Sequence, residues 1–304
     1  MATHDRFHSN PTQARALTLA LHGKWYGRYG LACCPAHGDR RPSLTLADAP
    51  DGRLLLSCKT GCSFRDVLAA LRDRGLVDRM DRPQPPSPSE IARRRAEDEA
   101  EAVKRERQAL AVWRESIPVP GTIAETYLRG RGITCPLPDS LRFHPACWHA
   151  SAQRLPALVA RVDGLPRLAV HRTYLRADGS GKAEVDPPKA MLGAALGGAV
   201  RVADGPGPLV VAEGIETALS LPSGLLRGPA TVWAALSAAG MAGLRLPGGI
   251  PHKLTIAPDG DTAGREAAHK LAERATALGW TVSLLPAPEG RDWNDILMLK
   301  GAAA

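Results

Sequence analysis

Short apolar runs alternate with helical segments in the last third of the chain. After Pro208, four runs of mostly apolar residues have the length of strands: Leu209–Ala212, Thr231–Leu236, Leu254–Ala257 and Val282–Leu285. Between the last two runs, an apolar stripe recurs at helical spacing: Ala263, Ala267, Leu271, Ala275 and Leu278. Almost wholly apolar strands that alternate with helices are typical of a parallel sheet covered on both faces. The pattern predicts an α/β fold with a Rossmann-like parallel sheet over residues 206–304.

The preceding residues divide into three segments of different composition. Residues 1–81 are rich in Gly and contain four of the six cysteines, so they form a small module rather than a large core. Residues 82–120 combine a Pro/Ser linker with a charged helix. Residues 121–205 combine a short helix over Thr122–Arg129 with alternating strands across Leu155–Leu175. This third segment is therefore predicted to be an α+β subdomain.

The linker and the helix that follows it carry little apolar surface. The linker reads RPQPPSPS, and Ser87 or Ser89 is a candidate cap for a helix from Glu90 to about Glu115. We interpret this helix as a solvated spacer, and a DNA-tracking arm built on Arg93–Arg95 is the alternative.

Composition and charge narrow the class of protein. The chain has 304 residues, 44% of them hydrophobic, which is enough for at least one packed core. Its formal net charge of +8 favours polyanionic partners. The sequence begins without the apolar segment of a signal peptide, and no stretch approaches the roughly 18 apolar residues of a membrane helix. We therefore expect a cytoplasmic protein with no membrane partner, in which clustered cysteines bind metal rather than form disulfides.

The N-terminal segment contains two close pairs of potential metal ligands. Cys34 and His37 enclose two residues, Cys58 and Cys62 enclose three, and twenty residues separate the pairs. Two such pairs supply the four ligands that tetrahedral Zn²⁺ requires. A segment this small gains folding energy from a bound metal. The spacing predicts a zinc-ribbon-like module with one structural Zn²⁺, and Cys33 is an alternative to Cys34 as a ligand.

Acidic residues follow three of the four predicted strands. Glu213 follows the first run, Asp259 and Asp261 follow the third, and Asp292 and Asp295 come after a short loop at the end of the last. Because the carboxyl ends of parallel strands meet at one edge of the sheet, these carboxylates are expected to converge. Converging carboxylates repel unless a divalent cation neutralises them, and their oxygens suit Mg²⁺ or Mn²⁺. This arrangement predicts a metal and phosphate site, although Asp261 also fits a cap of the next helix.

Two further motifs are weak candidates for functional sites. The segment GSGKAE around Lys182 lacks the spacing and the hydroxyl of a P-loop, so we interpret it as a hairpin tip. The segment HPACWH brings His144, Cys147 and His149 close in sequence, but no second ligand pair follows at a useful distance. We predict that these three residues, and Cys135, are ordinary buried residues.

Several segments together resemble a known family. EGIETAL, APDGDTAG and GRDWNDIL resemble the Toprim domain of bacterial and phage primases, while CPAH and CKTGC resemble the zinc-binding domain of those primases. Between them, LRFHP, HRTYL and PPKAMLG resemble the remaining half of the primase catalytic core. The likeness covers nearly the whole chain apart from the linker helix, and the order of the parts is more specific than any one motif. It implies a DNA primase, an enzyme that makes short primers by metal-dependent nucleotidyl transfer.

The resemblance also implies roles for individual residues. Glu213 would act near the 3′-hydroxyl or as a general base, Asp259 and Asp261 would hold Mg²⁺ or Mn²⁺, and Asp292 and Asp295 look like the late acidic pair of the Toprim domain.

The basic residues and the partners follow from the same resemblance. Lys189 matches the lysine of the family's strip that faces nucleotide or template, and Arg172 and Lys182 are weaker candidates for that strip. The implied partners are a single-stranded DNA template, nucleoside triphosphates and a separate replicative helicase.

Two features depart from the replicative primase. Thr217 stands where that enzyme carries an acid, four residues after Glu213, and Glu216 comes one place earlier. The spacing of Cys58 and Cys62 is one residue longer than in that enzyme. Both features suit a phage, plasmid or mobile-element primase better. A Toprim nuclease and a non-catalytic, single-stranded-DNA-binding replication accessory protein remain the alternatives.

Overall fold

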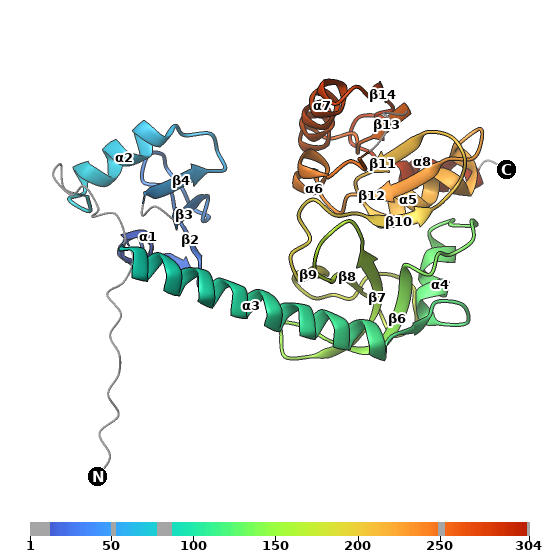
Figure 1. Ribbon diagram of the computed structural model, residues 1–304, viewed down its shortest axis with the longest axis horizontal. Coiled ribbons are helices and arrows are strands. Elements are labelled where there is room, and N and C mark those ends of the chain that lie inside the picture. The colour runs from blue at the N-terminus through green and yellow to red at the C-terminus, as the bar shows by residue number, and fades with distance from the viewer. Residues whose placement is uncertain (1–12, 50–52, 78–86, 249–252, 303–304) are drawn as a thin grey trace, which may run out of the picture. The chain divides into compact units, whose positions relative to one another are not determined.

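The computed structural model describes residues 13–49, 53–77, 87–248 and 253–302. These residues belong to two compact units, an N-terminal unit (Met1–Asp98) and a C-terminal unit (Glu99–Ala304) (Figure 1). The linker residues 82–86 lie outside the described ranges. Among the described helices, none is both long enough and apolar enough to cross a membrane.

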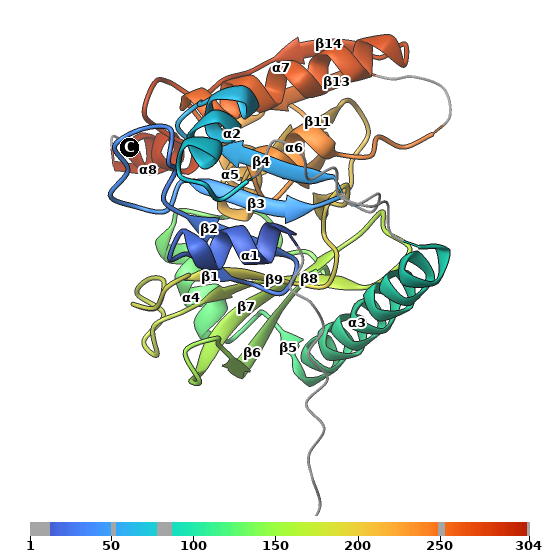
Figure 2. The same cartoon turned by 90° about the vertical axis from the view of Figure 1, so that its left-hand side faces the viewer.

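The N-terminal unit is built on a four-stranded antiparallel sheet. Its strands are adjacent in chain order: β1 (Lys24–Trp25), β2 (Tyr29–Ala32), β3 (Leu44–Asp48) and β4 (Leu54–Cys58). Helix α1 (Gln13–Ala20) contacts β2 and β3, and α2 (Phe64–Asp73) lies beyond β4 (Figure 2).

Alternation along β3 separates the two faces of this sheet. Leu44 and Leu46 are fully buried and pack with Leu17 of α1 and with Val67 and Leu71 of α2. A core of this size is small, which agrees with the expectation that a metal contributes to the stability of the unit.

The long helix α3 (Pro88–Glu115) contains the boundary between the two units. Of the two predicted caps, Ser87 is the one used: its Oγ accepts from the Glu90 amide at 3.2 Å, and the Glu90 carboxylate accepts from the Ser87 amide at 2.8 Å. Most of the helix is exposed, and only Ala109 and Trp113 near its end are buried. Apart from that end, the helix has the solvated surface that its composition predicts.

A five-stranded antiparallel sheet opens the C-terminal unit. Its strands are adjacent in chain order: β5 (Ile117–Pro118), β6 (Leu141–Trp148), β7 (Arg154–Val162), β8 (Ala169–Tyr174) and β9 (Lys189–Leu192). Ala109 and Trp113 of α3 pack on one face, against Val159, Val170 and Tyr174. Helix α4 (Ile123–Gly130) contacts β6 and β7. The sequence pattern did not predict β6, because Pro145 and a bulge between His144 and Cys147 interrupt its alternation.

The second sheet confirms the predicted α/β fold. Its strand order is β10-β12-β11-β13-β14, and only β10 (Val200–Ala203) runs antiparallel. The four parallel strands are β11 (Leu209–Ala212), β12 (Thr231–Ala234), β13 (Lys253–Ala257) and β14 (Thr281–Leu284), at the positions of the four apolar runs.

Helices cover both faces of this sheet. Helices α6 (Ala238–Gly243) and α7 (Thr262–Ala277) pack against Val211 and Ile256 on one face. On the other face are α5 (Ile215–Ser220), the π-helical turn η1 (Leu221–Leu225) and α8 (Trp293–Ala302). The predicted stripe of α7 is buried at its three central positions, whereas its end residues, Ala263 and Leu278, are exposed.

One hydrophobic core joins the two sheets of the C-terminal unit. Leu158 and Leu175 of the antiparallel part belong to the same buried cluster as Val210, Ile215 and Leu219 of the parallel part. Because this core is continuous, side chains of β8 and β9 are held against α5. That contact positions the site described next.

Candidate functional site

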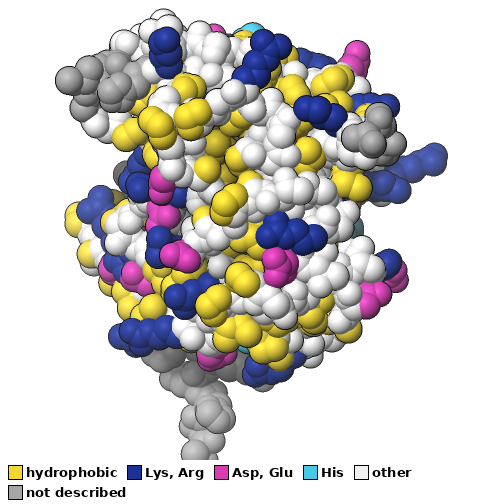
Figure 3. Space-filling model, turned by 90° about the vertical axis from the view of Figure 1, so that its right-hand side faces the viewer, with side chains coloured by type: hydrophobic (Ala, Val, Ile, Leu, Met, Phe, Trp, Pro, Cys, Tyr) yellow, Lys and Arg dark blue, Asp and Glu magenta, His cyan; other side chains and the backbone are white. Residues whose placement is uncertain are grey.

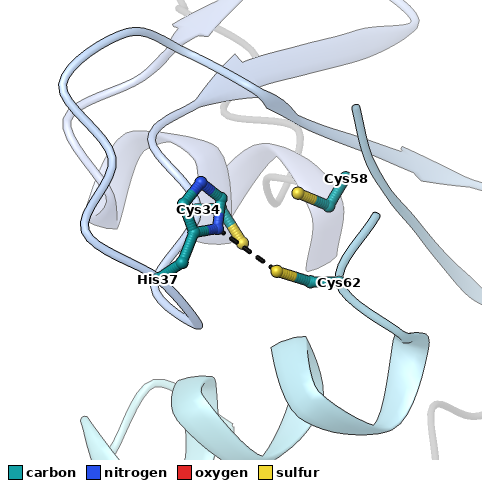
Figure 4. A group of neighbouring side chains, drawn as sticks. All are labelled: Cys34, His37, Cys58 and Cys62. Atoms are coloured by element: carbon teal, nitrogen blue, oxygen red, sulfur yellow. Dashed lines mark hydrogen bonds between the residues drawn. The ribbon is translucent and has the colours of Figure 1, made fainter. Parts of the chain in front are cut away.

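The structure brings the four predicted zinc ligands together. One ligand atom from each of Cys34, His37, Cys58 and Cys62 lies within 4.8 Å of all the others. The three sulfur atoms and the imidazole point toward a common centre, and His37 Nδ1 is 3.2 Å from Cys62 Sγ (Figure 4). Cys33 is not part of this cluster, so the geometry favours Cys34. A left-handed Gly61, with φ of +94°, turns the chain between Cys58 and Cys62.

Asp39 organises one side of this cluster. Its Oδ2 accepts hydrogen bonds from the Cys34 amide at 2.8 Å and from the Ser43 hydroxyl at 2.6 Å, and it lies 3.8 Å from His37 Nε2. The Ser43 hydroxyl and the Cys34 amide hold the pKa of this carboxyl below its ordinary value. A carboxylate on the second nitrogen of a histidine fixes the ring for metal binding through the first. The sequence pattern missed Asp39, because supporting carboxylates have no fixed spacing from the ligands.

The chemistry of this donor set fits Zn²⁺. Three thiols and one imidazole are a common set for a structural zinc site. Burial raises the pKa of the Cys34 thiol to about 11. At Cys58, burial also raises the pKa, but hydrogen bonds from the backbone of Cys62 and Thr60 lower it to about 6.

The outer face of the N-terminal sheet carries exposed aromatic and apolar side chains. The rings of Tyr26 and Tyr29 stack with centroids 5.3 Å apart, and Lys24 Nζ lies 5.4 Å from the Tyr26 ring centre. Leu55 of β4 is about half exposed, and so is Phe64, the first residue of α2, which lies beside Leu55 and Ala47. The pairing of Tyr29 with Ala47 and of Ala47 with Leu55 aligns this surface across three strands. Stacking surfaces with a nearby cation are typical of sites for single-stranded nucleic acid.

Glu213 and Asp259 lie at the same edge of the parallel sheet. Ala212 of β11 pairs with Ala257 of β13, so the residues that follow these strands leave the sheet side by side. The Gly260 amide then donates a hydrogen bond to the Arg291 carbonyl at 2.8 Å, which brings the loop before α8 to this edge. Gly260 is required there, since a Cβ atom would lie 1.9 Å from the Pro288 carbonyl oxygen.

The other three predicted acids cap helices. Asp261 Oδ1 accepts from the Gly264 amide at 2.6 Å and begins α7, the role that the sequence left open. Asp292 and Asp295 cap α8 reciprocally, because the carboxylate of each accepts from the amide of the other, at 2.8 and 3.1 Å. Asp292 is half-buried, whereas Asp295 is exposed.

Electrostatics nevertheless couple four of these carboxylates. Burial, followed by the charges of Glu213, Asp292 and Asp261, raises the pKa of Asp259 to about 7. Burial and the charge of Asp261 likewise raise the pKa of Glu213. The four groups therefore act as one acidic site at this edge of the sheet.

This acidic edge fits a hard divalent cation. Its donors are carboxylate oxygens, Glu213 Oε2 is buried without a hydrogen-bond partner, and the mutual repulsion at Asp259 is the kind that a cation relieves. Among the described residues, the Cys/His cluster is the one group of three or more ligand side chains already gathered closely enough to hold a metal ion, so the carboxylates of this edge are less tightly gathered.

The side chains of Thr217 and Glu216 contact different groups: Thr217 contacts the acidic edge, and Glu216 contacts two lysines. The Thr217 hydroxyl lies 3.4 Å from Asp259 Oδ1, so it takes part in the acidic edge at the position where an acid was expected. Glu216 contacts lysines instead: Lys189 Nζ is 3.3 Å from its Oε2 and Lys182 Nζ is 3.4 Å from its Oε1. The Tyr127 hydroxyl donates to Oε1 at 2.7 Å. Neither Tyr127 nor the pairing of Glu216 was visible in the sequence, since these contacts span up to 89 positions.

Of the predicted basic strip, the structure brings together Lys182 and Lys189 but not Arg172. Lys189 pairs with Thr173 across β8 and β9, whereas Arg172 pairs with Ala190 and therefore points to the opposite face. There its guanidinium donates to the carbonyl oxygens of Trp148 and Met191. The charge of Lys189 lowers the pKa of Glu213, so this lysine lies close to the acidic edge.

The second Cys/His segment is buried as predicted. His144 contacts Glu115, His149 contacts Ser151 and the Pro187 carbonyl, and Cys147 is fully buried. In the described ranges these residues form no metal-ligand cluster. Cys135 is buried as well.

An apolar groove of about 600 Å³ lies elsewhere in the C-terminal unit, between α4, η1 and α8. Leu297, Met298 and Gly132 line it, and none of the acidic residues does. The face of the molecule that carries α4 and α8 mixes hydrophobic and charged side chains (Figure 3). Nothing in the described part of the chain shows what would cover this groove.

Two domain families and several solved structures match this chain. Residues 103–202 match a domain of unknown function, DUF7146, and residues 208–303 match the Toprim domain. No curated protein matches. The chain is similar to the zinc-binding and RNA polymerase domains of the Aquifex aeolicus primase, with 15% identity and a TM-score of 0.38 over 97% of this chain and 81% of that chain. It is also similar to a DNA primase domain from Pseudomonas aeruginosa, with 18% identity and a TM-score of 0.40 over 64% and 75% of the two chains.

The match to the Toprim family covers the four parallel strands β11–β14 and the helices around them, up to α8. The acidic edge described above lies within the matched residues. Residues 208–303 of this chain belong to the Toprim domain family.

Proposed function

We propose that this chain is a DNA primase that joins nucleoside triphosphates into short primers on a single-stranded DNA template. The observation that carries the proposal is the acidic edge of the Toprim domain, Glu213 beside Asp259, with Lys189 close to it. The Cys/His cluster of the N-terminal unit supports the same proposal, because a zinc module followed by a Toprim domain is the order of parts that the sequence shares with primases.

The carboxylates of the acidic edge would have two different roles, metal binding and proton transfer. Asp259, together with Asp261 and Asp292, would hold Mg²⁺ or Mn²⁺, and Asp295 would support Asp292 through their shared cap. A bound divalent cation supplies charge neutralisation at the phosphates and lowers the pKa of the attacking hydroxyl. Glu213, whose pKa is raised by burial, is suited to accept the proton of the 3′-hydroxyl. The 3′-oxygen then bonds to the α-phosphorus, and pyrophosphate leaves.

Other surfaces would hold the incoming nucleotide and the template. Lys182 and Lys189 are suited to the phosphates of the incoming nucleotide. The exposed aromatic face of the N-terminal sheet, with Tyr26, Tyr29 and Phe64, is suited to stack on unpaired template bases.

Three finer points rest on the sequence resemblance. The zinc and divalent cations are the proposed cofactors, and a separate replicative helicase is the proposed partner. Thr217 in place of an acid favours a primase of a phage, plasmid or mobile element.

An assay with a single-stranded template, labelled nucleoside triphosphates and Mg²⁺ or Mn²⁺ tests the proposal. We expect short labelled products from the wild-type chain, and none from Glu213→Gln. Glu266→Gln, at an exposed position of α7, is the matched control and should be fully active. A shortened template would identify a Toprim nuclease instead, and template binding without any product would identify an accessory protein.

A further inference from the structure

One carboxylate of the Toprim domain is kept apart from the acidic edge. Glu216, on α5, is only 4% exposed, yet it stays charged. Burial raises its pKa, but the ammonium groups of Lys189 and Lys182 outweigh that effect and hold the pKa well below its ordinary value. A buried carboxylate is tolerated in a protein only when it is paired in this way.

The two lysines reach both the buried carboxylate and the surface. Their side chains are 33% and 36% exposed, while that of Glu216 is 5% exposed. An ammonium group has three donors, and the contact with Glu216 uses one of them on each lysine. The remaining N–H donors of Lys182 and Lys189 are therefore available to a hydrogen-bond acceptor that approaches from solvent.

Two uncharged groups complete this cluster, Tyr127 and His171, and Lys189 also acts on one carboxylate outside it, that of Glu213. Tyr127 donates to Glu216, and burial with the neighbouring carboxylate raises the tyrosine pKa, so its hydroxyl stays neutral. His171 is buried on the same face of the sheet as Lys189, and burial lowers its pKa to about 4. Two ammonium groups and one carboxylate leave an excess of one positive charge.

We propose that Glu216 is a positioning residue that fixes Lys182 and Lys189 as a paired site for the phosphate chain of a nucleoside triphosphate. The identity of this ligand rests on the proposed function. Lys189 connects the pair to the chemistry, since its charge also acts on Glu213. Without the carboxylate, the two ammonium groups would repel each other and separate.

Equilibrium binding of MgATP to the full chain, measured by calorimetry, tests this role. Glu216→Gln keeps the shape of the side chain and removes its charge, and we expect it to weaken binding by about tenfold or more, the range of a charge-assisted hydrogen bond. Glu216→Asp keeps the charge and should recover part of the affinity. Arg176→Gln is the matched control, because Arg176 lies in the same hairpin but pairs with the exposed Glu184.

A double-mutant cycle separates positioning from a direct role. If Glu216 acts through the lysine, Glu216→Gln should have little further effect on MgATP binding in a Lys189→Gln background. Additive losses, or a folded Glu216→Gln that binds MgATP like the wild type, would overturn the inference. If Glu216→Gln does not fold, Lys182→Gln and Glu216→Asp take its place, and unchanged binding in both would also overturn it.

The outcome is distinguishable from a failure of the proposed function. A wild-type chain that binds MgATP through these residues but makes no primer contradicts the primase and leaves the phosphate site. In a chain that does make primers, Glu216→Gln should raise the KM for nucleotide with little change in kcat; an unchanged KM would contradict only the phosphate site.

Discussion

At the scale of single residues, the acidic edge is shaped by unequal surroundings. Asp259 is half-buried and faces three other carboxylates, which is why its pKa lies at about 7. Asp261 and Asp295, by contrast, are exposed and occupied by helix caps. The proposed chemistry of this edge is therefore centred on Asp259 and Glu213.

The raised pKa of Asp259 makes a prediction about stability. A carboxyl whose pKa is higher in the folded state than in the unfolded chain contributes stability below its unfolded value, near pH 3.8, and loses it as the pH rises through about 7. Asp259→Asn cannot ionise, so it does not lose folding stability as the pH rises through this range. Its melting temperature should therefore exceed that of the wild type at pH 8, by a few degrees (about 2–4 °C per kcal/mol), and exceed it less at pH 5.

Thermal unfolding at the two pH values, without added divalent cation and without a chelator that would strip zinc, measures this difference. Glu266→Gln controls for the loss of an exposed carboxylate. A stabilisation that is equal at both pH values would show that Asp259 is not the group that titrates.

Thr217 leads to a second prediction at this scale. Its hydroxyl lowers the pKa of Asp259, so Thr217→Val should raise that pKa and let protons compete better with a metal. We expect Mn²⁺ binding, followed by electron paramagnetic resonance, to weaken by about three- to tenfold at pH 7, the range of one hydrogen bond to a charged group. The two proteins should converge at pH 9, where Asp259 is ionised in both. A loss that persists unchanged at pH 9 would instead indicate a disturbed fold.

At the scale of elements, sequence patterns predicted the parts whose signal is local. The four apolar runs correspond to β11–β14, and ligand spacing identified the cluster of Cys34, His37, Cys58 and Cys62. Strand β6 was not predicted, because Pro145 and a bulge break its alternation of apolar and polar residues.

The rest of the site depends on pairing between distant segments. Lys189 and, less strongly, Arg172 were both candidates for the basic strip, and only the register of β8 with β9 shows that they point to opposite faces. Glu216 has its partners on α4 and in the β8–β9 hairpin, so no spacing rule could have revealed them.

The zinc cluster gives the prediction that belongs to this scale. The protein should bind about one zinc per chain, the number that one four-ligand site holds. The double variant Cys58→Ser, Cys62→Ser should lose this zinc, because it removes half of the ligand set.

Elemental analysis of the purified proteins measures the zinc content. Cys33→Ser is the matched control and should keep the metal, since Cys33 lies outside the cluster. Full zinc in the double variant, or loss of zinc in the control, would move the site elsewhere.

At the scale of the whole molecule, we expect the C-terminal unit to carry out nucleotidyl transfer and the N-terminal unit to bind the template. Every proposed metal-binding acid lies in the C-terminal unit, and the proposed stacking surface lies in the N-terminal unit. Starting a primer requires two free nucleotides and a template to be held together, at a large entropic cost, whereas an annealed primer already supplies one reactant.

A truncated protein that begins at Ser89 should therefore lose de novo initiation by about 100-fold or more and keep part of its extension of an annealed primer. Gel assays on unprimed and primed templates compare the two activities. Undiminished initiation by the truncated protein would contradict this division and leave the zinc unit with a different role, such as binding a partner.

The central claim is that the acidic edge of this Toprim domain starts new chains on a template. The most direct measurement uses a circular single-stranded DNA, which has no 3′ end to extend, with nucleoside triphosphates and Mg²⁺ or Mn²⁺, and determines the mass of the products. We predict short oligonucleotides that carry a 5′-triphosphate and are complementary to the circle, from the wild type but not from Asp259→Asn. No product from the wild type, or equal product from Asp259→Asn, would contradict the account.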